Sequence, residues 1–160
     1  MNKENIISIL SEVMDPEIPV LSITDLGILR EVEVTENEIT VNITPTYSGC
    51  PAMDAIQQDI RKILAKNGME RVKINQVLSP AWTSDWMSRE GKEKLEAFGI
   101  APPAATAGCA MATTGNDKPD HCPLCQSKNI ELISRFGSTS CKALYRCLDC
   151  REPFDYFKCH

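Results

Sequence analysis

Two short cysteine motifs in the last quarter of the chain constrain its fold more than any other feature. The stretches HCPLCQS and RCLDCRE each hold two cysteines separated by two residues, and 21 residues separate the two motifs. The four residues are Cys122, Cys125, Cys147 and Cys150. A two-residue gap suits a tight turn whose two thiolates reach one ion, and the spacing is close to the usual one for four-cysteine zinc sites. We therefore predict a tetrahedral structural zinc site, with disulfide pairing or a rubredoxin-like iron site as alternatives.

The segment that carries these motifs, residues 119–160, is too short to depend on a hydrophobic core alone. The stretches NIELISRF, KALYRC and PFDYF between and after the motifs have the composition of strands. Strands around two cysteine turns are typical of a zinc ribbon, in which metal binding supplies much of the folding free energy. We predict a small zinc-ribbon domain at 119–160.

Three further cysteines and both histidines also lie in the C-terminal part of the chain. We expect Cys141 to be a small buried side chain and Cys159 and His160 to form a frayed tail; a second or alternate metal site is the competing interpretation. His121 adjoins the first motif, where a position beside the ligands or in solvent is expected rather than a ligand role. Cys109 is expected to be an exposed thiol without a role.

Composition and charge indicate a globular protein in a reducing compartment. Of the 160 residues, 42% are apolar and 24% are charged, and no run of 18 apolar residues predicts a membrane span. The first ten residues, MNKENIISIL, do not resemble a signal peptide, so a cytoplasmic location is expected. Residues 1–100 carry 16 acids and 10 bases, and residues 101–160 carry 6 acids and 7 bases. This balance argues against nucleic-acid binding.

The fold class expected is α+β, a small mixed sheet with packed helices followed by the ribbon. A stretch rich in Ala, Thr, Gly and Pro predicts a flexible linker at 101–118, which leaves 1–100 as the first domain. Apolar periodicity and turn residues predict the elements of that domain. They are helices over 3–14, 51–67 and 81–98, and strands over 28–34, 39–43 and 72–78, with a tight turn near residues 36–37 and a loop from Asp15 to Ile28.

One cysteine, Cys50, lies in the first domain, within the stretch TPTYSGCPAMDAI. Pro51 suits the first helical position, so Cys50 is expected near the N-cap, where the helix dipole and free N–H groups lower a thiol pKa. Gly49 lets the backbone bend and leaves the sulfur accessible. The competing interpretation is a buried cysteine that acts as a small hydrophobe.

The surroundings of Cys50 bear on which chemistry it can perform. A thiolate enzyme normally uses a histidine base, and both histidines lie in the ribbon, so thiol catalysis is disfavoured. Asp15 and Glu17 are the nearest candidate oxygen ligands, provided that the loop after the first helix folds over the Cys50 turn. Their alternative role is helix termination and solvation.

Trp82 and Trp86 stand four residues apart and are expected on one face of the helix over 81–98. They either cap the core between this helix and the sheet or form a docking surface for a partner protein, since tryptophan is frequent among binding hot spots.

The stretches DPEIPVLSITDLGI and TPTYSGCPAMDAI together resemble the small domain shared by bacterial SufT and a eukaryotic cytosolic iron–sulfur assembly factor. The stretch SPAWTSDWMSREGKEKLEAFGIAPP and the ending FGSTSCKALYRCLDCREPFDYFKCH resemble the PaaD family, and this resemblance covers nearly all of the chain apart from the linker. That family is encoded with a multicomponent monooxygenase that epoxidises the ring of phenylacetyl-CoA. The oxygenase has a di-iron catalytic subunit and an iron–sulfur reductase subunit.

The resemblance implies a non-catalytic accessory protein of phenylacetate degradation that matures or delivers iron or iron–sulfur centres to the oxygenase. Its partners would be oxygenase subunits and iron–sulfur assembly proteins. By the same analogy Asp15, Glu17 and Cys50 form the functional patch, with Thr46 and Ser48 beside it. A single cysteine cannot hold a four-ligand cluster, so a labile iron or cluster would need a homodimer or a partner's ligands. The alternative is a scaffold subunit of the oxygenase with only a structural zinc.

Overall fold

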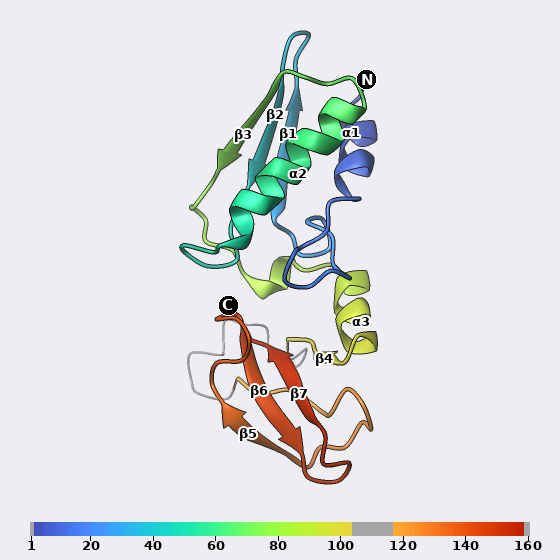
Figure 1. Cartoon of the computed structure of the whole chain (residues 1–160), viewed down its shortest axis with the longest axis vertical. Helices are drawn as coiled ribbons and strands as arrows, with labels where there is room; N and C mark the ends of the chain where they lie inside the picture. Colours follow the sequence, from blue (N-terminus) through green and yellow to red (C-terminus); the bar gives the residue numbers. More distant parts are fainter. Residues whose placement is uncertain (1, 104–116, 159–160) are drawn as a thin grey trace. The chain divides into compact units, whose positions relative to one another are not determined.

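The computed structural model describes residues 2–103 and 117–158, and its contacts divide the chain into two compact units (Figure 1). The first unit comprises Met1–Trp82 and Trp86–Ser88, and the second comprises Thr83–Asp85 and Arg89–His160. Most of the predicted linker, together with Cys109, Cys159 and His160, lies outside the described residues. Within the described ranges, no helix combines the length and the apolar character that a membrane crossing requires.

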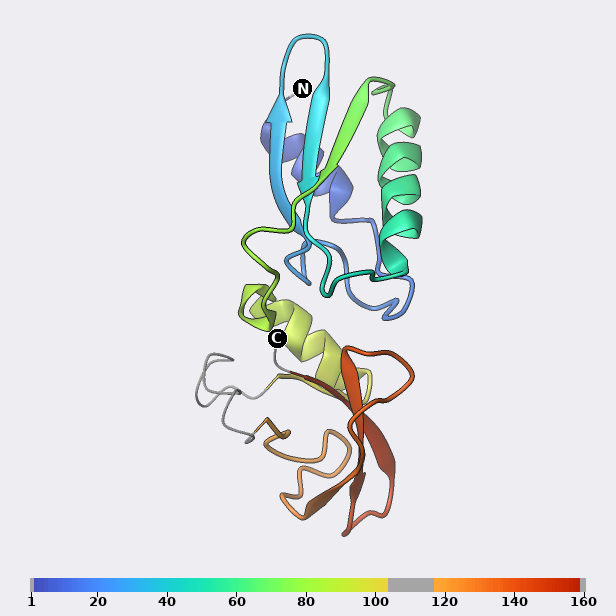
Figure 2. The same ribbon diagram turned by 90° about the vertical axis from the view of Figure 1, so that its left-hand side faces the viewer.

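The first unit is a three-stranded mixed sheet with two helices. Its elements are α1 (Lys3–Leu10), β1 (Leu29–Val34), β2 (Ile39–Ile43), α2 (Ala52–Lys66) and β3 (Val72–Gln76). The strand order is β1-β2-β3, with β1 antiparallel and β3 parallel to β2, so α2 is the crossover that the parallel pair requires. Helix α1 packs against α2 and β1, and α2 packs against β3 (Figures 1 and 2).

Side-chain periodicity explains why these segments adopt these elements. Strand β2 alternates between buried Ile39, Val41 and Ile43 and partly exposed residues. Helix α2 buries one stripe, made of Ala52, Met53, Ile56, Ile60 and Leu64. These two apolar surfaces form the core of the unit, as the sequence predicted.

The ends of α1 and α2 follow local chemistry. Helix α1 ends at Leu10, earlier than the predicted residue 14, because the chain tightens into i to i+3 bonds, with the Val13 N–H donating to the Leu10 carbonyl at 3.1 Å. Helix α2 ends close to its predicted limit. Gly68 follows it with φ +82°, and the Met69 N–H donates to the Leu64 carbonyl at 2.9 Å.

The helix predicted over 81–98 is wrong over its first half. The segment instead forms a 3₁₀ turn, η1 (Ser84–Trp86), and a shorter helix, α3 (Arg89–Ala97). Contacts within the first unit hold the start of the segment out of helical geometry. The Trp82 Nε1–H donates to the Leu26 carbonyl at 2.9 Å, and the Ser88 N–H donates to the Asp25 carbonyl at 2.8 Å.

The second unit contains a four-stranded sheet. Strands β5 (Ile130–Ser134), β6 (Lys142–Cys147) and β7 (Pro153–Phe157) run antiparallel, as the ribbon pattern predicted. A two-residue strand, β4 (Ile100–Ala101), pairs in parallel with β7 and gives the order β4-β7-β6-β5. Contacts thus group α3 and β4 with the ribbon, whereas the sequence placed the domain boundary after residue 100. The ribbon core is a small set of buried side chains: Ala101, Cys122, Ala143, Tyr145, Cys147, Phe154 and Tyr156.

Candidate functional site

The four cysteines of the ribbon motifs converge on one point. The Sγ atoms of Cys122, Cys125, Cys147 and Cys150 all lie within 4.8 Å of one another. The distance is 3.9 Å between Cys122 and Cys150 and 3.5 Å between Cys125 and Cys147. Four sulfurs about 2.3 Å from a tetrahedral zinc ion stand about 3.8 Å apart, so the group has the dimensions of a four-thiolate site.

The two motifs form matching turns. The residue after each motif has a left-handed backbone, with φ 65° at Gln126 and 64° at Arg151. The amide of the first cysteine donates to the carbonyl five residues later, at 2.8 Å for Cys122 and 3.0 Å for Cys147. These turns bring both cysteines of each motif to the same side of the backbone, which is the local reason that the sequence spacing predicts the site.

The thiols of this group compete for ionisation. The backbone N–H of Cys150 donates to the Cys147 sulfur at 3.5 Å and lowers the pKa of Cys147 to about 7. The N–H of Glu152 favours the Cys150 thiolate, but burial and the thiols of Cys147, Cys125 and Cys122 outweigh it and raise the pKa of Cys150 to about 12. A set of four thiolates this close together therefore needs a cation to hold its charge.

His121 belongs to a contact between α3 and the first cysteine motif. Its Nε2 lies 2.8 Å from Glu96 Oε1, and Gln126 Nε2–H donates to the same oxygen at 3.2 Å. The His121 hydrogen bond, followed by that of Gln126, lowers the pKa of Glu96. Cys141 is buried, 3% exposed, and its sulfur lies 2.9 Å from the Thr139 hydroxyl. Neither His121 nor Cys141 is among the four ligand candidates.

The first unit places Cys50 at the start of α2. Pro51 is the N-cap residue and α2 begins at Ala52, so Cys50 lies one position earlier than predicted. The thiol is partly exposed, and the exposed Gly49 beside it has φ +76°. The Thr46 hydroxyl approaches the Cys50 sulfur at 3.9 Å. Cys50 is therefore a partly exposed residue directly before the N-cap of α2, and its role stays a prediction.

The predicted lowering of the Cys50 pKa is wrong. Burial of the thiol raises its pKa, and the negative charge of Glu17 raises it further. The backbone N–H of Ala52 and the hydroxyls of Thr46 and Tyr47 favour the thiolate but do not outweigh the burial. One N–H at the helix start, that of Ala52, therefore favours the thiolate as expected, while desolvation decides the direction of the shift.

The loop after α1 carries both predicted carboxylates, Asp15 and Glu17. Glu17 is close enough for its charge to act on Cys50. Asp15 is only 6% exposed, and its Oδ1 accepts the N–H groups of Glu17 and Ile18, each at 2.8 Å. Asp15 thus orders the turn that carries Glu17. Ser48 is exposed in the Cys50 turn.

Tyr47 makes a contact that was not predicted from the sequence. Its hydroxyl interacts with Cys50 and favours the thiolate. The sequence feature that could have predicted this contact is the position of Tyr47, three residues before Cys50 in the same turn.

The two tryptophans occupy different environments rather than one helix face. Trp82 is 5% exposed and belongs to the core, which removes it from any docking surface. Trp86 is partly exposed, and the Arg30 guanidinium lies 3.6 Å from the centre of its ring. Trp86 alone keeps the predicted docking role as a hypothesis.

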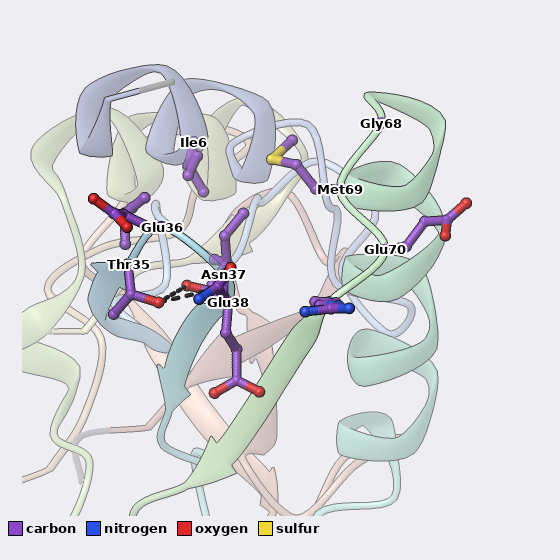
Figure 3. A pocket seen from close by; sticks show the side chains of 11 residues that line it. Ile6, Thr35, Glu36, Asn37, Glu38, Gly68, Met69 and Glu70 are labelled. Atoms are coloured by element: carbon purple, nitrogen blue, oxygen red, sulfur yellow. Dashed lines mark hydrogen bonds between the residues drawn. The ribbon is translucent and has the colours of Figure 1, made fainter.

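A cavity of about 680 Å³ lies elsewhere in the first unit and is separate from Cys50 (Figure 3). It lies at the β1–β2 turn, where the Thr35 hydroxyl donates to the Glu38 carbonyl at 2.9 Å. Gly68 and Met69, which follow α2, form another wall. Since Cys50 precedes α2, the length of that helix, about 22 Å, separates the two places.

Comparisons with known proteins cover both parts of the chain. Residues 3–75 match a family described as iron–sulfur cluster assembly protein, and residues 106–158 match the PaaD zinc beta ribbon domain. An Escherichia coli K12 protein, provisionally named as a component of 1,2-phenylacetyl-CoA epoxidase, is 49% identical over 95% of this chain and 90% of its own length. A Porphyromonas gingivalis protein named Fe-S protein maturation auxiliary factor is 40% identical over 58% of this chain and 90% of its own.

Solved structures resemble the first part of the chain. A domain of unknown function, DUF59, from Bacillus anthracis has a TM-score of 0.55 and 31% identity, and the match covers 58% of this chain and 90% of that one. A conserved hypothetical protein from Thermotoga maritima has a TM-score of 0.51 and 28% identity, with 59% and 94% covered. Together with the E. coli relative, which matches along nearly the whole length, these findings show that the chain belongs to the PaaD family, in which an iron–sulfur assembly domain precedes a zinc ribbon.

Proposed function

We propose that this protein is a non-catalytic accessory factor of phenylacetyl-CoA epoxidation that binds iron or an iron–sulfur cluster loosely at Cys50 and passes it to the oxygenase. The observation that carries this proposal is a partly exposed cysteine at the start of α2, close enough to Glu17 for the charge of that carboxylate to act on the thiol. The names of the relatives, an epoxidase component and Fe-S maturation factors, support the same role.

The raised pKa of Cys50 supports loose binding. The thiolate is the form that ligates a metal, and at its ordinary pKa of 9.0 a thiol is about 1% ionised at pH 7. Burial and Glu17 reduce that fraction further. Iron must therefore displace a proton from the thiol, so that the Fe–S bond forms as H⁺ leaves, and this requirement weakens binding at neutral pH. A weakly held cargo is one that a partner can remove.

The first unit supplies an incomplete ligand set for this cargo. Cys50 offers one sulfur and Glu17 one carboxylate, with the Thr46 and Tyr47 hydroxyls able to hydrogen bond to the thiolate. Asp15 orders the turn that carries Glu17, because its Oδ1 accepts the Glu17 N–H. The missing ligands would come from a second copy of the chain or from an assembly protein or oxygenase subunit, and ligand exchange between such partners is a route for transfer.

We assign a structural zinc ion to the ribbon cysteines. The four sulfurs lie within 4.8 Å of one another, which suits one tetrahedral ion, and a bound cation would stabilise the thiolates that neighbouring thiols disfavour at Cys150. A closed set of four thiolates leaves no position for a substrate, so this ion stabilises the fold and takes no part in transfer.

Iron uptake by variant proteins tests the Cys50 assignment. Zinc-loaded protein is reconstituted anaerobically with ferrous iron and sulfide, desalted and analysed for iron. Cys50→Ala should lose most of the iron that the wild type retains. Cys141→Ala is the matched control because it removes a buried thiol by the same substitution and should retain the iron. Equal iron in the wild type and Cys50→Ala would exclude the site.

A scaffold subunit with only a structural zinc is the second candidate. The positions of the candidate metal ligands favour it. Among residues 2–103 and 117–158, one group of three or more acidic, histidine or cysteine side chains is close enough to share an ion, and that group is the four ribbon cysteines. The two candidates differ in what the oxygenase contains when it is produced with Cys50→Ala. Full iron occupancy of the oxygenase supports the scaffold, and depleted iron supports delivery.

A further inference from the structure

The ribbon sheet has an edge strand with an unusual composition. Strand β5 pairs with β6 on one side, and within the described residues no strand pairs with its other side. Its sequence is IELIS, in which Leu132 is 46% and Ile133 is 50% exposed. The single charged residue, Glu131, forms an ion pair with Arg146 of β6. Proteins usually protect edge strands with charges or proline, so an exposed apolar edge indicates a binding surface.

The edge of the other sheet illustrates that protection. Strand β1, sequence LREVEV, is also at an edge and buries only Val32 between charged, exposed neighbours. These two edge strands therefore differ, since β1 carries charged residues along its length and β5 is mostly apolar. The register shift of β5 between Leu132 and Ser134 leaves only a short regular segment, about three residues, for a further strand.

A cavity adjoins the exposed edge. Its volume is about 370 Å³, and its apolar walls include Leu132, Phe136 and Tyr145. Phe136 is 66% exposed. The cavity is therefore large enough for one or two apolar side chains and is open to solvent.

The charge around this cavity is mainly positive. Lys118, Arg135 and Lys158 line it together with one acid, Asp117, which accepts a hydrogen bond from the Tyr156 hydroxyl at 2.5 Å. Lys158 donates to the Arg135 carbonyl at 2.9 Å, and its Nζ lies 4.5 Å from the centre of the Phe136 ring. The cation and the aromatic ring are thus held together before any ligand arrives.

We infer that β5 and this cavity form a docking surface for an extended acidic peptide segment of a partner protein, which adds a strand to β5 and places an apolar side chain beside Phe136. The backbone of the open edge supplies the hydrogen bonds, the cavity takes alternate side chains, and the three cations select acidic neighbours. This inference goes beyond the proposed function because it involves neither Cys50 nor the ribbon metal.

A peptide fits these observations better than a nucleic acid does. Nucleic-acid surfaces neutralise many phosphates, whereas here three cations are partly balanced by Asp117 and the adjoining strand is apolar. The backbone hydrogen-bonding groups of an open strand edge match those of an extended peptide. They have no such match in a phosphate backbone.

Fluorescence anisotropy with full-length, zinc-loaded protein tests the surface. The probe is a labelled peptide of seven residues that alternates aspartate and leucine. One comparison peptide has lysine in place of aspartate, and another has N-methyl groups that block strand pairing. The protein variants are Arg135→Glu and Phe136→Ala, both at exposed positions. Lys73→Glu is the matched control, with the same change of charge at an exposed position on β3 of the first unit.

The acidic peptide should bind, and both Arg135→Glu and Phe136→Ala should weaken it by at least about fivefold, as should N-methylation. Lys73→Glu should bind like the wild type, and zinc content should be equal in all proteins. Equal binding of the lysine peptide, or equal losses in Arg135→Glu and Lys73→Glu, would overturn the inference. So would a seven-nucleotide single-stranded DNA that binds more tightly than the peptide and loses affinity in the same two variants.

Discussion

Substitution of Gly27 by alanine should destabilise the first unit strongly, because the structure leaves no room for one added carbon. Gly27 has φ +72°, and a Cβ built on it would lie 2.5 Å from the carbonyl oxygen of Trp86, 2.8 Å from its Cβ and 2.9 Å from its carbonyl carbon. Two of these three atoms are backbone atoms. Relief therefore requires a shift of the chain rather than a change of rotamer.

The contacts around Trp86 oppose such a shift. The Arg30 guanidinium packs on its ring at 3.6 Å, and the Ser88 N–H donates to the Asp25 carbonyl at 2.8 Å two residues later. A left-handed backbone costs a residue with a side chain roughly 1–2 kcal/mol, and overpacking adds about 1–3 kcal/mol. Gly27→Ala should thus lose about 2–5 kcal/mol of unfolding free energy, a large share of the stability of a small domain.

Gly68→Ala separates the two contributions. Gly68 has a similar φ, +82°, but no atom lies within 4 Å of a Cβ built on it. This variant should lose only the backbone contribution, roughly 1–2 kcal/mol. Urea unfolding followed by tryptophan fluorescence reports on the correct unit, since Trp82 and Trp86 are the two tryptophans of the chain and both belong to the first unit. Equal losses of stability in the two variants would refute the predicted clash.

Further outcomes are expected at three places in the chain. In Glu17→Gln the pKa of Cys50 should fall and in Thr46→Val it should rise, so alkylation of Cys50 by iodoacetamide at pH 8, followed by peptide mass spectrometry, should be faster in the first and slower in the second. Because the folded pKa of this thiol is above its ordinary value of 9.0, its contribution to stability is present below pH 9 and declines as the pH rises through the folded value; Cys50→Ala should remove that alkaline decline. Removal of the ribbon metal by a strong chelator should abolish the near-ultraviolet circular dichroism of the ribbon tyrosines while tryptophan fluorescence stays native. Trp82→Phe should lose about 1–3 kcal/mol of unfolding free energy, since the buried Leu26 carbonyl loses its donor, and the remaining tryptophan can report the unfolding.

The sequence predicted best those features that local chemistry determines. The cysteine motifs specify the ribbon because each turn is a short-range structure and the four sulfurs of the two turns lie within 4.8 Å of one another. The α2 boundaries follow from Pro51 and Gly68, which restrict or extend the backbone angles of single residues. The β1–β2 turn near residues 36–37 was predicted for the same reason, and the Thr35 side chain closes it with two hydrogen bonds to Glu38.

Features that depend on distant parts of the chain were predicted less well. The segment from Trp82 to Ser88 has partners in the loop that contains Asp25 and Leu26, and no property of the segment itself reveals them. The strand β4 has two residues and exists because β7 pairs with it. Such a short strand carries no periodicity from which it could be predicted.

Part of the candidate Cys50 site could be predicted from local sequence, and part depends on distant parts of the chain. Its position at the start of α2 follows from Pro51, whereas the direction of its pKa shift follows from burial and from the approach of Glu17. Burial depends on tertiary packing, and the sequence offered Glu17, 33 positions earlier, as a candidate only on the condition that its loop folds over the Cys50 turn. The predicted effect of N–H groups at the helix start is present in the hydrogen bond from Ala52, but burial makes the largest contribution.

If the ribbon holds a resident zinc ion and Cys50 a loosely bound iron, as proposed, the two sites should differ in their affinity for metal. The ribbon gathers four thiols within 4.8 Å of one another, so a divalent cation gains four ligands at once. Cys50 offers a single thiol that holds its proton. Affinity for divalent metals at such sites is higher for zinc than for ferrous iron, and four ligands enlarge the difference in binding free energy. Zinc should therefore fill the ribbon first, and iron then meets only the weaker site. If zinc-free protein is offered iron, the ribbon should bind it in a rubredoxin-like form that persists in Cys50→Ala, whereas zinc-loaded protein should bind iron only through Cys50. Iron that depends on Cys50 even in zinc-free protein would contradict this order of affinities.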